Sequence, residues 1–353
     1  MNILDKKNSK IAIIGLGYVG LPLAVEFGKD RPTIGFDTNN ERIKELKSGK
    51  DLTLEVDTKD ILDSHLLEFT SNLNDLKDSK VFIVTVPTPI DSAKRPDLEP
   101  IIKASHSVGN ILKKNDIVIY ESTVYPGCTE EKCIPILEKC SGLKYNKDFF
   151  CGYSPERINP GDNSKKLNNI EKIFAINTNN KVILNRIKNI YKIISKRIIF
   201  SKSIAEAETA KAIENTQRDL NIALYNELLI FSNKLNLDFN EIIRLASSKW
   251  NFLKFKPGLV GGHCLPVDPY YLSYIASKNK FEMKVALAGR SVNNNMKNFV
   301  LKIFYENIKK NKIKKNSNVL VVGLSYKYGV SDLRNSLNLA IFNEIRKKFK
   351  KTL

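Results

Sequence analysis

The segment Gly15-Leu16-Gly17-Tyr18-Val19-Gly20 constrains the fold most, because it joins an apolar run to a helical pattern. Residues 10–14 form a short β-prone run, and residues 21–29 have apolar side chains at helical spacing. In such a setting the first glycine permits a tight turn, the second lets the backbone approach a pyrophosphate, and the third allows close packing of the helix. The segment therefore predicts a dinucleotide site whose contacts are Gly15, Gly17, Tyr18, Val19 and Gly20.

An acidic residue predicts which dinucleotide is preferred. Residues 33–37 form a second β-prone run that ends in Asp37. A carboxylate at this point can bind the ribose hydroxyls of the adenosine, and it would repel a 2′-phosphate. The sequence thus favours NAD over NADP, and a glycine-rich turn without a ligand is the weaker alternative. Arg42, in the following segment, is a further expected cofactor contact.

Alternating strand and helix patterns predict an α/β fold with a doubly wound, Rossmann-like N-terminal domain. Apolar runs at residues 81–86, 117–120, 151–153 and 173–176 read as strands, and two of them lead into turns that carry Thr88 and Thr123. Carboxyl ends of parallel strands line the ligand crevice, so both threonines are expected to contact cofactor or substrate. The alternative for either threonine is a helix N-cap.

Two long helical patterns separate this domain from a second apolar run. The patterns cover residues 205–235 and 285–308, and the run at residues 319–324 reads as the start of a second, incomplete Rossmann-like sheet. We expect an NAD-binding domain at residues 1–202, a central helical domain for dimerisation and substrate at 203–312, and the beginning of a C-terminal domain at 313–353. The long first helix is expected to act as a spine.

Composition indicates a soluble, cytoplasmic protein. No apolar run approaches the roughly 18 residues of a membrane span, and the first residues lack the layout of a signal peptide. Five scattered cysteines favour reduced thiols, and Cys128, Cys133 and Cys140 lack the spacing of a metal site, so packing roles and no metal are expected. The net charge of +19 is interpreted as solvated lysine-rich surface, with nucleic-acid binding as a distant alternative.

Cys264 is the strongest candidate for covalent chemistry. It lies in Gly261-Gly262-His263-Cys264-Leu265-Pro266-Val267-Asp268, which sets a thiol four residues before a carboxylate. A thiol beside a hydride acceptor suits the oxidation of an alcohol beyond the aldehyde. His263 adjoins the thiol, but neighbouring side chains often point apart, so we assign it no role. Lys211 and Asn215 share a helix face and are either solvated or oxyanion donors.

These motifs carry a resemblance over essentially the whole chain. The stretches at residues 13–24, 120–130, 152–162, 213–224 and 248–272 resemble the UDP-glucose/GDP-mannose dehydrogenase family, and within it the bacterial UDP-N-acetylhexosamine 6-dehydrogenases. The resemblance implies a four-electron oxidation at C6 of a UDP-sugar by two NAD molecules in turn, in the synthesis of surface polysaccharide precursors. The unusual length of the helical pattern at residues 205–235 also suggests a homodimer formed through the central helix.

The resemblance assigns roles to single residues. Cys264 matches the nucleophile and Asp268 the acid that activates water. Lys211 and Asn215 match the oxyanion-stabilising pair, and Thr123 and Glu156 match groups that hold water and assist proton transfer. The resemblance also implies substrate contacts at a further set of positions: Phe252, Leu253, Phe255, Gly258, Gly261, Lys327 and Arg334.

Two departures from the family pattern affect the prediction. Pro160 stands where UDP-glucose enzymes carry a second acid, which favours an N-acetylated sugar and leaves open whether it is the gluco or galacto epimer. Family members continue beyond the segment Asp332-Leu333-Arg334-Asn335-Ser336, whereas this sequence ends at Leu353. We therefore expect retained NAD binding with weak UDP-sugar binding, and a weakly active remnant and a UDP-glucose 6-dehydrogenase remain alternatives.

Overall fold

The computed structural model describes residues 9–157, 170–330, 332–349 and 351–352. The chain divides into two compact units, Met1–Ala212 (unit 1) and Ile213–Leu353 (unit 2). The expected three-part division at residues 202 and 312 stays a prediction. Pro160 and Ser331 lie outside the described residues.

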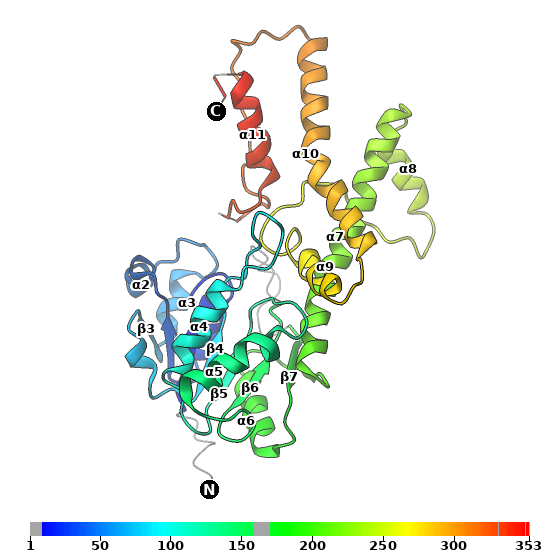
Figure 1. Cartoon of the computed structure of the whole chain (residues 1–353). Helices are drawn as coiled ribbons and strands as arrows, with labels where there is room; N and C mark the ends of the chain where they lie inside the picture. Colours follow the sequence, from blue (N-terminus) through cyan, green and yellow to red (C-terminus); the bar gives the residue numbers. More distant parts are fainter. Residues whose placement is uncertain (1–8, 158–169, 331, 350, 353) are drawn as a thin grey trace. The chain divides into compact units, whose positions relative to one another are not determined.

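Unit 1 is built on one eight-stranded sheet with the order β3-β2-β1-β4-β5-β6-β7-β8 (Figure 1). All neighbouring strands are parallel except β6 and β7, which are antiparallel. The first six strands have the order of a doubly wound dinucleotide-binding sheet. The strands are β1 (Ile11–Ile14), β2 (Thr33–Phe36), β3 (Leu67–Thr70), β4 (Val81–Val84), β5 (Ile117–Tyr120), β6 (Phe150–Tyr153), β7 (Lys172–Ile176) and β8 (Ile198–Phe200).

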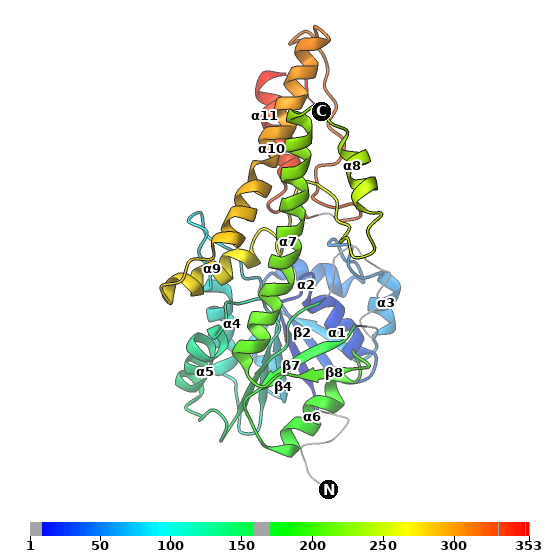
Figure 2. The ribbon, with the colours of Figure 1, turned by 90° about the vertical axis from the view of Figure 1, so that its right-hand side faces the viewer.

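Helices cover both faces of this sheet, which explains why its central strands are apolar throughout. Every residue of β1, β2, β4, β5 and β6 is buried. Helices α1 (Gly20–Gly28), α2 (Asn40–Lys47) and α6 (Lys181–Tyr191) share one core cluster with these strands. Figure 2 shows α4 (Glu99–Gly109) and α5 (Ile134–Ser141) on the opposite side of the sheet from α1 and α3 (Thr58–Asp63). The doubly wound architecture is thus confirmed.

The parallel strands deliver the candidate residues of unit 1 to one edge. The fingerprint turn follows β1, Asp37 follows β2, and the segments that carry Thr88, Thr123 and Glu156 follow β4, β5 and β6. This edge, formed by the carboxyl ends of the strands, is where doubly wound folds bind ligands. Two short helical turns, η2 (Leu73–Leu76) and η3 (Thr129–Cys133), complete the connections.

Unit 2 is helical. Helix α7 (Ile204–Lys234) begins in unit 1 and continues here, followed by α8 (Phe239–Ala246), α9 (Asp268–Lys278), α10 (Lys284–Lys310) and α11 (Leu337–Lys348). Helix α10 packs against α7 at Gly289, where an added Cβ would lie 2.5 Å from a terminal carbon of the Leu220 side chain. Beside this contact, Arg290 is ion-paired with Asp219 at 2.6 Å between Nη1 and Oδ1. Helices α10 and α11 lie side by side (Figure 1).

The strand expected at residues 319–324 is wrong. Within the described part of the chain, this segment forms only an isolated bridge between Val319 and Thr352. Val319 and Val321 pack against the α11 cluster of Ile341, Ile345 and Phe349, while Leu320 and Val322 are 72% and 85% exposed. An extended segment needs a neighbouring strand to satisfy its backbone groups, and a single bridging residue does not supply one.

Candidate active site

The fingerprint turn has the backbone geometry that the glycines predict. Gly15 has a φ of +94°, which favours glycine, and its N–H donates to the Phe36 carbonyl at 2.8 Å. A Cβ on Gly20 would lie 1.8 Å from the Gly15 oxygen, so only glycine fits there. A Cβ on Gly17 would meet no heavy atom of the described chain within 4 Å. The turn therefore leaves open space beside Gly17, as the approach of a pyrophosphate requires.

Asp37 and Arg42 both hold the fingerprint turn. One oxygen of Asp37 accepts the Leu16 N–H at 2.9 Å, and the other accepts the Asn39 N–H at 2.9 Å. The Arg42 Nε donates to the Leu16 carbonyl at 3.0 Å, and its Nη1 donates to Asp51 at 2.8 Å. A carboxylate has lone pairs for further donors, so Asp37 can serve a ribose as well. Direct cofactor contacts by either residue stay predictions.

Thr88 and Thr123 lie together at the carboxyl edge. The Thr88 hydroxyl donates to the Thr123 carbonyl at 2.5 Å and joins the turns after β4 and β5. The N-cap positions of α4 and η3 are Leu98 and Cys128. The N-cap alternative is therefore wrong for both threonines, and both lie at the carboxyl edge of the sheet that also carries the fingerprint turn.

Lys211 is fixed to the segment that carries Glu156. The Lys211 ammonium donates to the Glu156 carbonyl at 2.6 Å, and both residues are buried. The alternative of a solvated lysine is wrong. Helix α7 thus supplies a cation to the end of β6, next to a carboxylate that the sequence singled out.

Unit 2 brings three candidate residues together. The Asn215 amide donates to Asp268 Oδ2 at 2.5 Å, and both side chains are buried. Asp268 starts helix α9, and its N–H donates to the Cys264 carbonyl at 2.9 Å. This turn holds the Cys264 backbone one helical turn before the carboxylate. A half-buried thiol, a buried carboxylate and an amide donor are therefore close in one part of unit 2.

The two glycines before Cys264 dock the segment that carries Arg334. The Gly262 N–H donates to the Arg334 carbonyl at 3.0 Å, and the Asn335 amide donates to the Gly262 carbonyl at 2.9 Å. A Cβ on Gly261 would lie 2.6 Å from the Cβ of Tyr326. Gly261 and Arg334, both expected substrate contacts, are thus neighbours. Lys327 lies in the same segment, where its carbonyl accepts the Ser325 hydroxyl at 3.0 Å.

The other expected substrate residues form a loop held against helix α7. The Tyr225 hydroxyl donates to the Leu253 carbonyl at 2.6 Å, and the Gly258 N–H donates to Asn226 at 2.8 Å. The Phe252 and Phe255 rings lie 6.3 and 6.1 Å from the Tyr225 ring. The loop is therefore anchored at both ends while the Leu253 side chain is exposed.

Sequence reasoning missed the environment of His263. Its Nδ1 lies 3.3 Å from Asp332 Oδ2, and Arg334 binds the same carboxylate at 2.7 Å. Burial would lower the pKa of His263, but hydrogen bonds to Asp332 and Cys264 outweigh it and raise that pKa to about 9. The imidazole is therefore charged at neutral pH beside the candidate nucleophile. Because Asp332 is distant in the sequence, spacing alone gave no signal.

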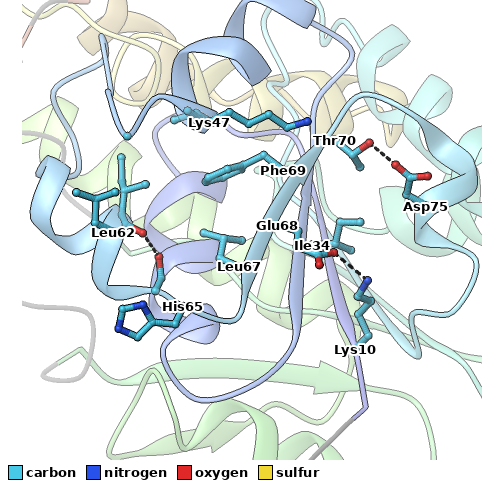
Figure 3. Close-up of a pocket in the computed structure, with 14 residues that line it drawn as sticks. Lys10, Ile34, Lys47, Leu62, His65, Leu67, Glu68, Phe69, Thr70 and Asp75 are labelled. Atoms are coloured by element: carbon cyan, nitrogen blue, oxygen red, sulfur yellow. Dashed lines mark hydrogen bonds and ion pairs between the residues drawn. The ribbon is translucent and has the colours of Figure 1, made fainter.

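A hollow of about 580 Å³ lies at the β3 edge of unit 1 (Figure 3). Its apolar lining includes Leu62, Leu67 and Phe69. Two polar pairs also line it: Lys10 is ion-paired with Glu68, and the Thr70 hydroxyl is hydrogen-bonded to Asp75. None of the candidate site residues lines this hollow.

The described residues contain neither a metal-binding cluster nor a membrane-spanning helix. Across the described ranges, no three His, Cys, Asp or Glu side chains are grouped so that they could hold a metal ion. In the same part of the chain, no helix is long and apolar enough to cross a membrane.

Comparison with known proteins identifies the family. Residues 9–195 match the NAD-binding domain of the UDP-glucose/GDP-mannose dehydrogenase family. Residues 205–295 match the central domain of the same family. The chain is 52% identical over 340 residues to the UDP-N-acetyl-D-glucosamine 6-dehydrogenase of Salmonella typhi and 51% identical over 341 residues to that of Pseudomonas aeruginosa. Each alignment covers 96% of this chain and 80% of the relative.

Solved structures agree with this assignment. The UDP-D-ManNAc dehydrogenase from Pyrococcus horikoshii superposes with a TM-score of 0.87 at 35% identity, covering 97% of this chain and 82% of that one. The chain therefore belongs to the UDP-glucose/GDP-mannose dehydrogenase family, and it is an NAD-dependent nucleotide-sugar dehydrogenase.

Proposed function

We propose that this chain oxidises C6 of a UDP-N-acetylhexosamine from alcohol to carboxylate, with Cys264 as the covalent catalyst. The observation that carries the proposal is the grouping of Cys264, Asp268 and Asn215 in unit 2. Nucleophile, acid and amide donor are the groups that such an oxidation needs. The names of the two relatives from Salmonella typhi and Pseudomonas aeruginosa support the same activity.

The proposed reaction consumes two NAD molecules and one water. NAD, when bound at the fingerprint turn, accepts one hydride from C6 in each oxidation. After the first oxidation the Cys264 sulfur adds to the C6 aldehyde, which gives a thiohemiacetal that again carries a hydride on C6. Loss of that hydride leaves a thioester. Water then attacks C6, the C–S bond breaks, and the carboxylate and the free thiol are released.

The remaining candidates have supporting roles in this scheme. Asp268, which accepts the Asn215 amide hydrogen bond, removes a proton from the attacking water. Lys211 and Asn215 stabilise the oxyanions at C6, while Thr123 and Glu156 hold water and assist proton transfer. Lys327 and Arg334 supply positive charge toward the diphosphate, and Arg334 is already oriented by Asp332.

The substrate is proposed to be UDP-N-acetylglucosamine or UDP-N-acetylgalactosamine. Assays with these two sugars and with UDP-glucose, at equal concentration and with saturating NAD, test this assignment through NADH absorbance. We expect a kcat/KM at least about tenfold higher for an N-acetylated sugar, a difference of about 1.4 kcal/mol in transition-state binding. Faster turnover of UDP-glucose would overturn the assignment. UDP-N-acetylmannosamine extends the comparison to the activity named for the Pyrococcus horikoshii structure.

We further propose a homodimer formed through α7. Three apolar residues recur at helical spacing on one face of this helix, Leu224, Leu228 and Phe231, and Leu235 follows directly after its end; all four are exposed. Exposed apolar side chains in such a stripe favour burial against a second copy. A cytoplasmic role in supplying surface polysaccharide precursors belongs to the same proposal.

A further inference from the structure

A buried charge cluster lies at the carboxyl edge of the unit 1 sheet. The Lys172 ammonium is 2.5 Å from Glu121 Oε2 and 3.6 Å from Glu156 Oε2. Side-chain exposures are 2% for Lys172, 0% for Glu121 and 8% for Glu156. The Tyr191 hydroxyl donates to Glu121 Oε1 at 2.6 Å. One lysine therefore faces two carboxylates out of contact with water, an arrangement that is costly unless each charge is compensated.

Strand register explains why the lysine stands there. In the antiparallel pair of β6 and β7, Tyr153 lies opposite Ala175. Continued by three residues, this register brings Glu156 opposite Lys172. Strand β5 lies on the other side of β6 with Tyr120 opposite Tyr153, and Glu121 is the next residue. The single antiparallel strand pair of the described sheet thus brings a lysine to an edge where parallel strands deliver carboxylates.

We propose that Lys172 is a positioning residue for Glu156, holding its carboxylate in a fixed orientation by an ion pair, with Glu121 and Tyr191 anchoring the lysine. This inference rests on the proposed function, because it concerns the proton-transfer role assigned there to Glu156.

The charges around Glu156 support this role. Its Oε1 accepts the Arg157 backbone N–H at 2.5 Å, and its Oε2 faces Lys172. From helix α7, Lys211 binds the Glu156 carbonyl and not the carboxylate. The ion pair with Lys172 thus contacts the second carboxylate oxygen, while the backbone holds the first.

Lys172 is itself kept charged by its partners. Burial would lower the pKa of Lys172, but Glu121 and Glu156 outweigh it and raise that pKa. Burial raises the pKa of Glu121, against the opposing effects of Lys172 and Tyr191. Glu121 and Glu156 therefore compete for one ammonium, and neutralising Glu121 leaves more of that positive charge to Glu156.

Opposite pH effects of two variants test the inference. We expect Lys172→Met to lower kcat at least about tenfold, with KM changed less than about twofold, and to move the acidic limb of the kcat–pH profile upward by about one pH unit. Glu121→Gln should move that limb downward. Lys172→Arg should restore part of kcat. A packing role alone would not give opposite shifts.

Lys80→Met is the matched control. Lys80 is paired at 3.0 Å with the buried Asp116, at the amino end of the same sheet. This variant also removes a lysine partner from a buried carboxylate, so we expect lower thermal stability with an unshifted pH profile. A profile unshifted in both Lys172→Met and Glu121→Gln, or shifted in the same direction by both, would overturn the inference.

A double-mutant cycle measured by thermal unfolding tests the Lys172–Glu156 contact without an activity assay. Lys172→Met, Glu156→Gln and the double variant should be non-additive in Tm, because Glu156→Gln costs less once Lys172 is gone. Additive effects would refute the coupling. If the parent chain makes no NADH from any UDP-sugar, the proposed function fails, while this cycle still decides whether Lys172 holds Glu156. If Lys172→Met does not fold, the downward shift expected for Glu121→Gln still tests the inference, and its absence would overturn it.

Discussion

Asp37 holds the fingerprint turn, a structural role that the sequence did not predict beside the expected ribose contact. The position of the acid predicted a ribose contact, whereas the structure adds hydrogen bonds from Leu16 and Asn39 that hold the fingerprint turn. Those bonds were beyond sequence reasoning because they depend on the folded turn. A substitution at this residue therefore alters both cofactor choice and the shape of the site.

We expect Asp37→Ala to weaken NAD binding about tenfold and to reduce the preference for NAD over NADP, because the ribose acceptor and the negative charge are both lost. Titration calorimetry with each dinucleotide measures the change. Glu41→Ala, an exposed acid four residues later, is the control and should bind NAD like the parent. Tighter binding of NADP than NAD by the parent chain would contradict the assignment.

His263 is expected to increase the reactivity of Cys264. Since the pKa of His263 is raised to about 9, its positive charge is present at pH 7 next to the Cys264 side chain, to which it is hydrogen-bonded. We expect His263→Gln to slow alkylation of Cys264 at pH 7 about tenfold. Labelling with iodoacetamide followed by peptide mass spectrometry separates Cys264 from the half-buried Cys140. An unchanged alkylation rate of Cys264 in His263→Gln would show that His263 does not affect the reactivity of this thiol.

At the scale of elements, the sequence predicted the buried inner strands of the sheet and missed its two edge strands. Strands β1, β2, β4, β5, β6 and β7 and helices α1, α7 and α10 formed where apolar patterns predicted them. Strands β3 and β8 were missed because most of their residues are only partly buried, so they lack a continuous apolar run. The wrong strand at residues 319–324 had the composition of a strand, but a strand also needs partners.

The contacts within the site were less predictable than the elements. Asn215 and Asp268 meet because α7 lies against the start of α9, and Lys172 meets Glu156 because of an antiparallel register. Neither follows from local pattern. Family resemblance named Asn215, Asp268 and Glu156 without their geometry, and nothing in the sequence marked Lys172.

Helix α7 also stabilises the turn after β5. The buried Glu208 accepts N–H groups of Gly127 at 2.5 Å and Thr129 at 3.0 Å. Burial raises the pKa of Glu208 to about 7, against the hydrogen bonds that lower it. Between pH 4.5 and 7 the folded state binds the extra proton, so the free energy of unfolding falls as pH rises through this window.

We expect this fall to be on the order of 3 kcal/mol between pH 4.5 and 8, and Glu208→Gln to remove it. Urea unfolding at several pH values measures the effect. Glu206→Gln, on the exposed side of the same helix, should retain the fall of the parent chain. Glu208 would have no such role if its variant and the parent lost stability equally over this range.

At the scale of the whole molecule, the exposed stripe on α7 predicts self-association. We expect Phe231→Asp to weaken the dimer by at least about tenfold in Kd, because it buries a charge in an apolar interface. Sedimentation equilibrium measures the shift. Asn233→Asp adds the same charge at an exposed position off the stripe and should sediment like the parent. A parent chain that is monomeric at micromolar concentration would contradict the proposed interface.

The ratio of NADH formed to UDP-sugar consumed tests the central claim most directly, because the second oxidation is the step that needs a thiol. For the parent chain we expect two NADH per uronic acid, measured by absorbance and by mass spectrometry of the sugar product. Cys264→Ala should form no acid, whereas Cys140→Ala should match the parent. One NADH per sugar with an aldehyde product from the parent, or acid formation by Cys264→Ala at the parent rate, would contradict the account.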